Sequence, residues 1–346
     1  MRIWFNRWFT TVTHFMDMIR SNDDGRKFVI YGTHSNKDAL YLQNCDYAFT
    51  EPTVSGEQYI DFCLEFCRQH KIDIFIPRKE NVLISKRLAD FEAIGVKVLV
   101  CPDAELMETL DHKAAAYHSI LQKEENGMDL VSIPDFYVVN TINDFKNAYQ
   151  SLREKGHSVC FKPVIGEGAT GFRIIEDHIE SIDHLFRRAS SRRLSYKYAC
   201  EILSQQEVFP DLMVLEYLNG PEYSIDCVSS NEQLFAAIPR MKGEGRVREI
   251  VEHHELIQLA HTFHQHYKIP YIFNIQVKYN NGVPKLLEIN PRMSGGMHFS
   301  CLSGINFPYL AIKVLLGEEV GLLHPRFGIR ASHLEKEMIL DQDLFA

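Results

Sequence analysis

The chain has 346 residues, of which 45% are hydrophobic and 24% charged, and its formal net charge is −9. It is long enough for two or three domains, and its acidic balance argues against a general nucleic-acid binder, which needs a basic face. No run approaches the ~18 apolar residues of a membrane span, so no membrane partner is expected. The opening residues lack the continuous apolar segment of a signal peptide, and the eight scattered cysteines are typical of reduced thiols, so we expect a cytoplasmic protein.

In the first third of the chain, strands alternate with helices. Short apolar runs at 2–6, 27–33, 73–77 and 96–102 are separated by helical patterns, which indicates a parallel sheet covered on both faces. The first strand-to-helix turn has no GxGxxG sequence, so a dinucleotide is not indicated. Polar residues at the two strand ends could line one side of a cleft, or could equally be caps and surface groups: Arg7, Thr10 and Thr11 after the first strand, and Arg78, Lys79 and Glu80 after the third.

A helix is predicted from about Ala104 through residue 120, and it contains Lys113. A second helix starts near residue 141, and the stretch 158–175 then reads as strand, glycine loop, strand. Gly166, Gly168 and Gly171 expose backbone N–H groups that can cradle phosphate oxygens, and Lys162 lies on the strand just before them. The order of elements differs from that of a P-loop. A glycine-rich hairpin tip with a surface lysine is the alternative.

The strand at 213–218 ends in the turn Asn219-Gly220-Pro221, and an alternating strand follows. The backbone of a strand that stops in a turn can form hydrogen bonds with adenine, and Glu222 is then within reach of a ribose hydroxyl; an ordinary hairpin is the alternative.

A glycine-rich bend is surrounded by four basic residues that could hold an anionic substrate: Arg240, Lys242, Arg246 and Arg248. On the next helix, His261 and His264 are interpreted as part of an amphipathic surface and not as metal ligands.

The stretch Phe273–Gly296 reads as two strands joined by the hairpin turn Asn280-Asn281-Gly282. Glu288 and Asn290 share a face of the second strand, and Gln276 lies on the first. Oxygen ligands on rigid strands suit Mg²⁺, and Arg292 follows where it could contact the same phosphate. A solvated hairpin with a polar outer face is the alternative.

Four blocks in this order resemble the ATP-grasp superfamily: LDHKAAAY, FKPVIGEGATGF, MVLEYLNGPEYSIDC and FNIQV…LLEINPRMSGG. The last block is similar to one synthetase module of carbamoyl phosphate synthetase or to an amino-acid ligase. The N-terminal RIWFNRWFTT…THFMDMIR resembles ATP-grasp proteins encoded in tellurium-resistance operons. The resemblance implies an α/β protein with the ATP-grasp fold. Its expected parts are a doubly wound parallel-sheet domain (1–105), a linking helix (106–133), an α+β lid (134–213), an α+β C-terminal subdomain with an antiparallel sheet (214–330) and a tail (331–346).

The resemblance also implies a role for each matching residue. Lys113 and Lys162 hold phosphates, and the phosphate lid is formed by Gly166, Glu167, Gly168, Ala169, Thr170 and Gly171. Adenine is bracketed by Glu216, Tyr217 and Leu218, and ribose is bound by Glu222. The metal is held by Gln276, Glu288 and Asn290, of which Gln276 also counts toward the nucleotide site. The catalytic residues are Arg292, which stabilises the transferring phosphoryl group, Arg240, which holds the substrate or acyl phosphate, and Lys162.

The expected function is an ATP-dependent ligase with Mg²⁺ or Mn²⁺, which activates a carboxylate as an acyl phosphate for attack by an amine. The expected partners are a small carboxylate and an amine, with amino acids among the candidates, and a homodimer is common for such enzymes. The chain carries one synthetase module, so bicarbonate and carbamate chemistry is not expected. Two alternatives remain open: an ATP-binding regulatory or scaffolding protein, and an ATP-dependent phosphotransferase that acts on a small molecule.

Overall fold

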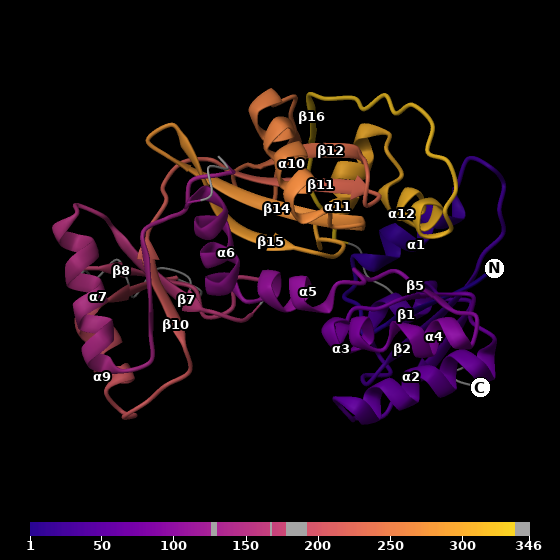
Figure 1. Ribbon diagram of the computed structural model, residues 1–346, viewed down its shortest axis with the longest axis horizontal. Helices are drawn as coiled ribbons and strands as arrows, with labels where there is room; N and C mark the ends of the chain where they lie inside the picture. The colour runs from indigo at the N-terminus through magenta and orange to yellow at the C-terminus, as the bar shows by residue number, and fades with distance from the viewer. Residues whose placement is uncertain (126–129, 167, 178–191, 336–346) are drawn as a thin grey trace. The chain divides into compact units, whose positions relative to one another are not determined.

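The computed structural model describes residues 1–125, 130–166, 168–177 and 192–335 (Figure 1). The chain forms two compact units. Unit 1 contains Met1–Glu108, Tyr223–Gln276 and the chain from Ile289 onward, and unit 2 contains Thr109–Glu222 and Val277–Glu288. The chain therefore passes from unit 1 into unit 2 twice. The domain boundaries given above stay predictions.

The N-terminal part of unit 1 is a parallel sheet, as predicted, with five strands in the order β3-β2-β1-β4-β5, one strand more than the four expected from the sequence. Its strands are β1 (Arg2–Asn6), β2 (Val29–His34), β3 (Tyr47–Thr50), β4 (Ile74–Ile76) and β5 (Lys97–Val98). Successive side chains of β1 point to opposite faces, so Trp4 belongs to one buried core and Ile3 and Phe5 to the other. Both faces are apolar because helices cover both.

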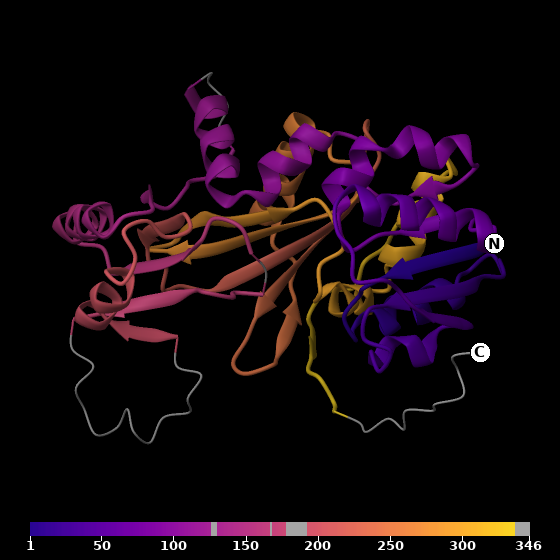
Figure 2. The same ribbon diagram turned by 90° about the horizontal axis from the view of Figure 1, so that it is seen from below.

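The helices on the Trp4 face are α2 (Glu57–His70), α3 (Asn81–Lys86) and α4 (Leu88–Ala93). The opposite face packs against α1 (Val12–Arg20), η1 (Leu40–Asn44) and α12 (Phe307–Leu315), so a helix from the far end of the chain completes the first domain (Figure 2). The thiols of Cys63 and Cys67 lie buried in the α2 interface, where they act as small apolar groups.

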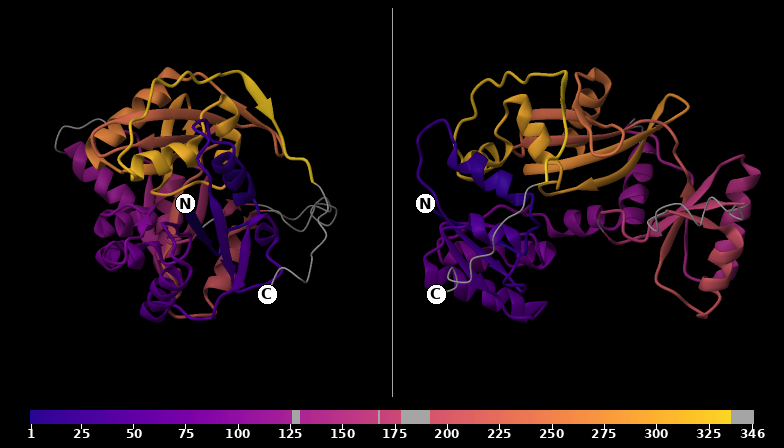
Figure 3. Two further views of the ribbon diagram at one scale, coloured as in Figure 1. Left: turned by 90° about the vertical axis from the view of Figure 1, so that its right-hand side faces the viewer. Right: turned by 180° about the vertical axis from the view of Figure 1, so that it is seen from behind.

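A six-stranded sheet has the order β15-β14-β11-β12-β13-β16. Its strands are β11 (Glu222–Ser229), β12 (Leu234–Lys242), β13 (Arg248–Ile250), β14 (Tyr271–Asn280), β15 (Val283–Asn290) and β16 (Ile329–Ala331). β11, β12, β13 and β16 pair antiparallel in turn, and β16 forms the edge of the sheet (Figure 3). Helix α10 (His254–Tyr267) packs on β12, and α11 (Met297–Ser300) and η2 (Cys301–Ser303) follow β15. The turn between β14 and β15 forms as predicted, since Asn281 and Gly282 have φ of 50° and 80°.

Unit 2 contains a five-stranded sheet in the order β6-β10-β7-β8-β9. Its strands are β6 (Phe136–Val139), β7 (Val159–Pro163), β8 (Arg173–Glu176), β9 (Arg193–Ser195) and β10 (Leu212–Glu216). Helices α7 (Ile142–Glu154) and α9 (Tyr196–Leu203) pack against this sheet over a core that includes Phe145 and Phe161 (Figure 3). The Thr141 side chain caps α7 by accepting a hydrogen bond from the Asp144 N–H.

The single helix predicted from Ala104 is wrong, because the chain forms two helices, α5 (Ala104–Asp111) and α6 (Lys113–Glu125). The break at His112 places Lys113 at the first turn of α6. Among the described residues, no helix combines the length and the apolar character that crossing a bilayer requires.

Candidate nucleotide-binding and catalytic site

Two buried or partly buried lysines of unit 2 donate hydrogen bonds to backbone carbonyls, one of them in the glycine loop. Lys113 is 9% exposed, and its Nζ donates a hydrogen bond to the Gly166 carbonyl at 2.6 Å. Lys162, on β7, donates to the Leu287 carbonyl at 3.1 Å and lies 5.7 Å from the centre of the Tyr117 ring. Burial lowers the pKa of Lys162 to about 8; the Glu288 carboxylate opposes this shift and the Lys113 ammonium adds to it. Both ammonium groups therefore lie where added negative charge would be strongly stabilised.

Tyr117 fixes the position of these lysines. Its hydroxyl donates to the Leu286 carbonyl at 2.6 Å, which ties α6 to β15 within unit 2. The ring is fully buried, and it separates the backbone of α6 from the Lys162 side chain. The spacing of residues along the sequence gives no sign of this anchor.

The glycine loop has the backbone that its sequence predicts. Gly166, Gly168 and Gly171 have positive φ, and so does Ala169 at 61°, which is uncommon for a residue with a side chain. At Gly171 a Cβ would lie 2.7 Å from the Pro163 ring, so glycine is required there for space as well as for conformation. Thr170 lies in the same turn, and Glu167 lies outside the described residues. The loop thus offers successive backbone N–H groups next to Lys113.

The strand end predicted to bracket adenine is held by a polar network within unit 2. The buried Glu216 carboxylate accepts hydrogen bonds from Lys285 at 2.6 Å and from Asn280 at 2.5 Å. These bonds outweigh burial and lower the pKa of Glu216. The Glu216 and Tyr217 N–H groups bond to the Asp135 and Ser158 carbonyls. The Glu216 side chain therefore holds Lys285 and Asn280 in place. Any adenine contact here would come from backbone groups up to Leu218. Glu222 begins β11.

The predicted metal ligands lie on the paired strands β14 and β15. Gln276 is on β14, and Glu288 and Asn290 lie two residues apart on β15, so these two share a face of that strand. Arg292 follows directly, in the loop before α11. One carboxylate with two amide oxygens is a donor set of the hard kind that Mg²⁺ prefers.

A buried hydrogen-bond network in unit 1 positions Arg240. Asp226 is fully buried, and its Oδ1 accepts from Asn274 at 2.8 Å and Ser294 at 2.7 Å. Its Oδ2 accepts from Ser300 at 2.6 Å and from Arg240 at 3.3 Å. Sequence reasoning missed this network, although Asp226 and Asn274 are polar residues in otherwise apolar strand segments, which is a usable signal.

The basic cluster predicted around the glycine-rich bend is not one group. Arg240 is buried and paired with Asp226, whereas Lys242 and Arg246 are exposed and Arg246 pairs with Glu335.

The prediction that His264 lies on the surface of α10 is wrong. His264 is 5% exposed, because the apolar face of α10 is wider than the spacing of residues indicated.

The overall arrangement matches known structures. The biotin carboxylase–βγ-ATP complex from Campylobacter jejuni superposes with a TM-score of 0.63 over 92% of this chain and 72% of that chain, at 16% identity. The L-amino acid ligase from Bacillus licheniformis gives 0.62 over 91% and 74%, at 15% identity. The biotin carboxylase domain of the Hydrogenobacter thermophilus 2-oxoglutarate carboxylase, in complex with MgADP, ADP and bicarbonate, gives 0.60 over 95% and 73%, at 13% identity.

This chain has the ATP-grasp fold. Residues 208–337 also match a family model described as "ATP-grasp in the biosynthetic pathway with Ter operon", which agrees with the two resemblances seen in the sequence. No curated protein sequence matches the chain.

Within this ATP-grasp chain, the residues present fit a nucleotide and a divalent cation. Lys113, Lys162 and the positive-φ loop supply cationic and N–H donors in unit 2, and Glu288 supplies the charged oxygen ligand. No group of three or more His, Cys, Asp or Glu in the described ranges could hold a metal.

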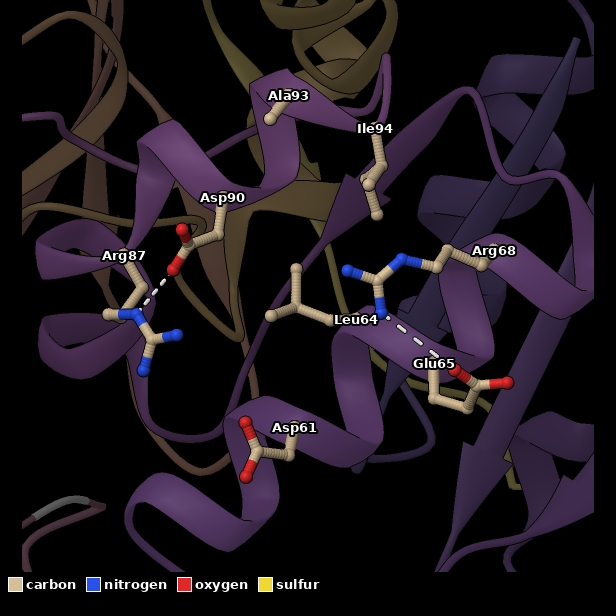
Figure 4. Close-up of a pocket in the computed structure, with 8 residues that line it drawn as sticks. All are labelled: Asp61, Leu64, Glu65, Arg68, Arg87, Asp90, Ala93 and Ile94. Atoms are coloured by element: carbon tan, nitrogen blue, oxygen red, sulfur yellow. Dashed lines mark hydrogen bonds and ion pairs between the residues drawn. The ribbon is translucent and has the colours of Figure 1, made fainter.

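A surface hollow of about 560 Å³ in unit 1 does not contain any of these residues. It lies between α2 and α4 and is lined by charged side chains that pair with one another, Arg87 with Asp90 and Arg68 with Glu65 (Figure 4). Both of its arginines are paired with carboxylates, so the hollow does not present an unpaired cation to a phosphate.

Proposed function

We propose that this protein is an ATP- and Mg²⁺-dependent ligase that joins a small carboxylate to an amine. The observation that carries the proposal is the pair of lysines in unit 2, Lys113 and Lys162, whose ammonium groups donate hydrogen bonds to the Gly166 and Leu287 carbonyls. The ATP-grasp fold and its ligase and carboxylase relatives support the same reaction class.

The chemistry follows from what each residue can do. A carboxylate oxygen of the substrate attacks the γ-phosphorus of ATP, the bond to the ADP oxygen breaks, and an acyl phosphate forms. The amine then attacks the acyl carbon, the carbon–oxygen bond to phosphate breaks, and the amine gives up a proton as the amide forms. Lys113 and Lys162 neutralise phosphate charge, and positioning of this kind is the main protein contribution to phosphoryl transfer.

Two arginines and three oxygen ligands complete the proposed machinery. Arg292 stabilises the transferring phosphoryl group, and Arg240 holds the substrate carboxylate or acyl phosphate. Gln276, Glu288 and Asn290 would hold Mg²⁺, with Mn²⁺ as a substitute, and the metal supplies charge neutralisation at the phosphates. The glycine loop excludes water, which would otherwise hydrolyse the acyl phosphate.

The test is ADP and phosphate release from Mg-ATP with pooled amino acids and small carboxylic acids, followed by mass spectrometry of any active pool. Release that depends on two compounds, with a condensed mass, supports the ligase and names its substrates. A stable phosphorylated product and no amide would indicate a phosphotransferase. Tight ATP binding with no compound-dependent turnover would favour a regulatory or scaffolding role.

A further inference from the structure

His298, on the short helix α11, has one ring nitrogen engaged and the other buried. Its Nδ1 lies 3.1 Å from the Gly295 carbonyl oxygen. A carbonyl only accepts hydrogen bonds, so Nδ1 carries the proton and the Nε2 of the neutral ring carries a lone pair. Nε2 is buried and has no hydrogen-bond partner within the described part of the chain. A buried acceptor without a donor lowers the stability of the fold. Such an atom therefore indicates a binding or catalytic role.

The Phe299 ring lies 4.4 Å from this imidazole, centre to centre, and the titratable groups around the imidazole are cationic or can become so. The His14 ring stacks on it at 4.7 Å between centres and 14° between planes, and the His333 ring lies at 5.2 Å. Arg240 lies against the same loop, since a Cβ on Gly296 would be 2.7 Å from its guanidinium nitrogens. Burial and then these three neighbours lower the pKa of His298 to about 4.

The charged groups on the surrounding elements are already paired or are cations. Asp226 accepts four hydrogen bonds, one of them from Arg240 of β12. Glu335, beyond His333, pairs with Arg246, and Glu249 of β13 lies 3.8 Å from Arg330. Arg248 of β13 adds a further cation, and both it and Arg246 lower the pKa of His333. The cluster of His14, His298, His333 and Arg240, which we call the histidine cluster, therefore has more positive than negative partners.

A metal does not explain the histidine cluster. Imidazole lone pairs lie in the ring plane, and the planes of His14 and His298 are nearly parallel and stacked, so their nitrogens do not converge on one point. The cluster lacks a proton for Nε2, and the Asp226 carboxylate that pairs with Arg240 is shared with three further donors, Asn274, Ser294 and Ser300. Arg240 itself has a buried Nε with no partner among the described residues.

We propose that an oxyanion group binds between Arg240 and His298, and that His298 takes up one proton from solvent as it binds. The imidazolium then donates from Nδ1 to the Gly295 carbonyl and from Nε2 to the oxyanion, and the Arg240 Nε supplies a second donor. The proton returns to solvent when the anion leaves. His14 and His333, whose rings lie against His298, are exposed side chains whose rotamers change readily, so they do not block entry.

The proposed function identifies this oxyanion as the carboxylate or acyl phosphate of the substrate, and that identification rests on the proposed function. The binding of an anion at this place does not rest on the proposed function. It follows from Arg240, His298 and their surroundings in unit 1, and it requires neither ATP nor turnover. Substrate affinity should therefore fall with rising pH, because the proton that must accompany the anion becomes scarcer.

The test uses the full chain, without ATP, and follows the histidine ¹³Cε1 signals by NMR. Inorganic phosphate and succinate are the two probes, and they distinguish phosphate from carboxylate as the preferred oxyanion. We expect a bound probe to raise the pKa of His298 by about 2 units. The Kd of the probe should then rise up to about tenfold per pH unit between the free-state and the bound-state pKa, and level off above the bound-state pKa. The His298→Gln variant assigns the signal, and it should bind at least about tenfold more weakly and without this pH dependence.

The exposed His254, on α10, provides the matched control, and His254→Gln should bind both probes like the unchanged chain. A His298 pKa that neither probe alters, or a His298→Gln variant with unchanged affinity and pH dependence, overturns the inference. The two proposals can fail separately. If ADP and a condensed product are released but the pKa of His298 does not shift, the ligase proposal stands and the proton-coupled site is refuted. If the pKa shifts but no condensed product forms, the proton-coupled site stands and the ligase proposal is refuted.

Discussion

Lys162 allows the reasoning about the nucleotide site to be tested through stability alone. Its pKa is lowered from 10.5 to about 8, chiefly by burial, so the folded chain holds this ammonium group against an unfavourable free energy. At 1.36 kcal/mol per pKa unit, the shift of about 2.5 units corresponds to roughly 3 kcal/mol of lost stability at pH 7. The Lys162→Met substitution keeps most of the side-chain length and removes the charge.

The expected gain is smaller than the full penalty. The substitution also removes the hydrogen bond from Nζ to the Leu287 carbonyl, which is worth about 1 kcal/mol. We therefore expect Lys162→Met to raise the free energy of unfolding by about 2 kcal/mol at pH 7, and to weaken ATP binding about 10- to 100-fold through loss of a charged hydrogen-bond donor. A gain in stability combined with a loss of binding is typical of a site built for a ligand.

The pH dependence gives the sharper test. Above pH 8 the folded chain releases the Lys162 proton while the unfolded chain, with its ordinary pKa, still holds it. The penalty in the unchanged protein is therefore present below pH 8 and disappears as pH rises toward 10.5. Urea unfolding followed by circular dichroism at pH 7 and pH 9.5 should show the advantage of Lys162→Met shrinking with pH.

The exposed Lys197 on α9 in the same unit is the matched control, and Lys197→Met should stay within about 0.5 kcal/mol of the unchanged chain at both pH values. A Lys162→Met variant that is destabilised at pH 7, or whose difference from the unchanged chain does not vary with pH, would refute the account of a desolvated ammonium group.

Three further substitutions test other parts of the structure. Glu288→Gln removes the only carboxylate among the predicted metal ligands, so Mg-dependent ADP release should fall about 100-fold or more while circular dichroism stays unchanged; release at the original rate would remove Glu288 from the metal site. Asp226→Asn leaves the buried Arg240 without its counter-charge and should lower the free energy of unfolding by about 3–5 kcal/mol in urea, and a change below about 1 kcal/mol would show the network to be dispensable. Gly171→Ala places a Cβ 2.7 Å from the Pro163 ring at a φ of +73°, whereas Gly168→Ala has a φ of +61° and, among the described residues beyond its chain neighbours, no atom within 4 Å of the added Cβ. Gly171→Ala should therefore weaken ATP binding more than Gly168→Ala does. Equal effects would mean that only backbone strain matters.

Much of the fold was predictable because it depends on local chemistry. The apolar strands of the first third require cover on both faces, and the order of strands and helices then leaves a parallel sheet. The turn at Asn281-Gly282 follows from the ease with which these residues adopt positive φ, and the same property shapes the loop from Gly166 to Gly171. In each case the deciding interaction lies within a few residues of the chain.

The chemistry of the candidate sites was decided by contacts between distant parts of the chain. Asp226 receives its hydrogen bonds from β12, β14 and the segment around α11, up to 74 residues away, so the role of its carboxylate cannot be read from its own strand. Lys162 owes its lowered pKa to burial and, beyond that, to the Lys113 ammonium group on α6. The sequence supplies the charged groups, but only packing removes water from them, and desolvation is what sets their energies.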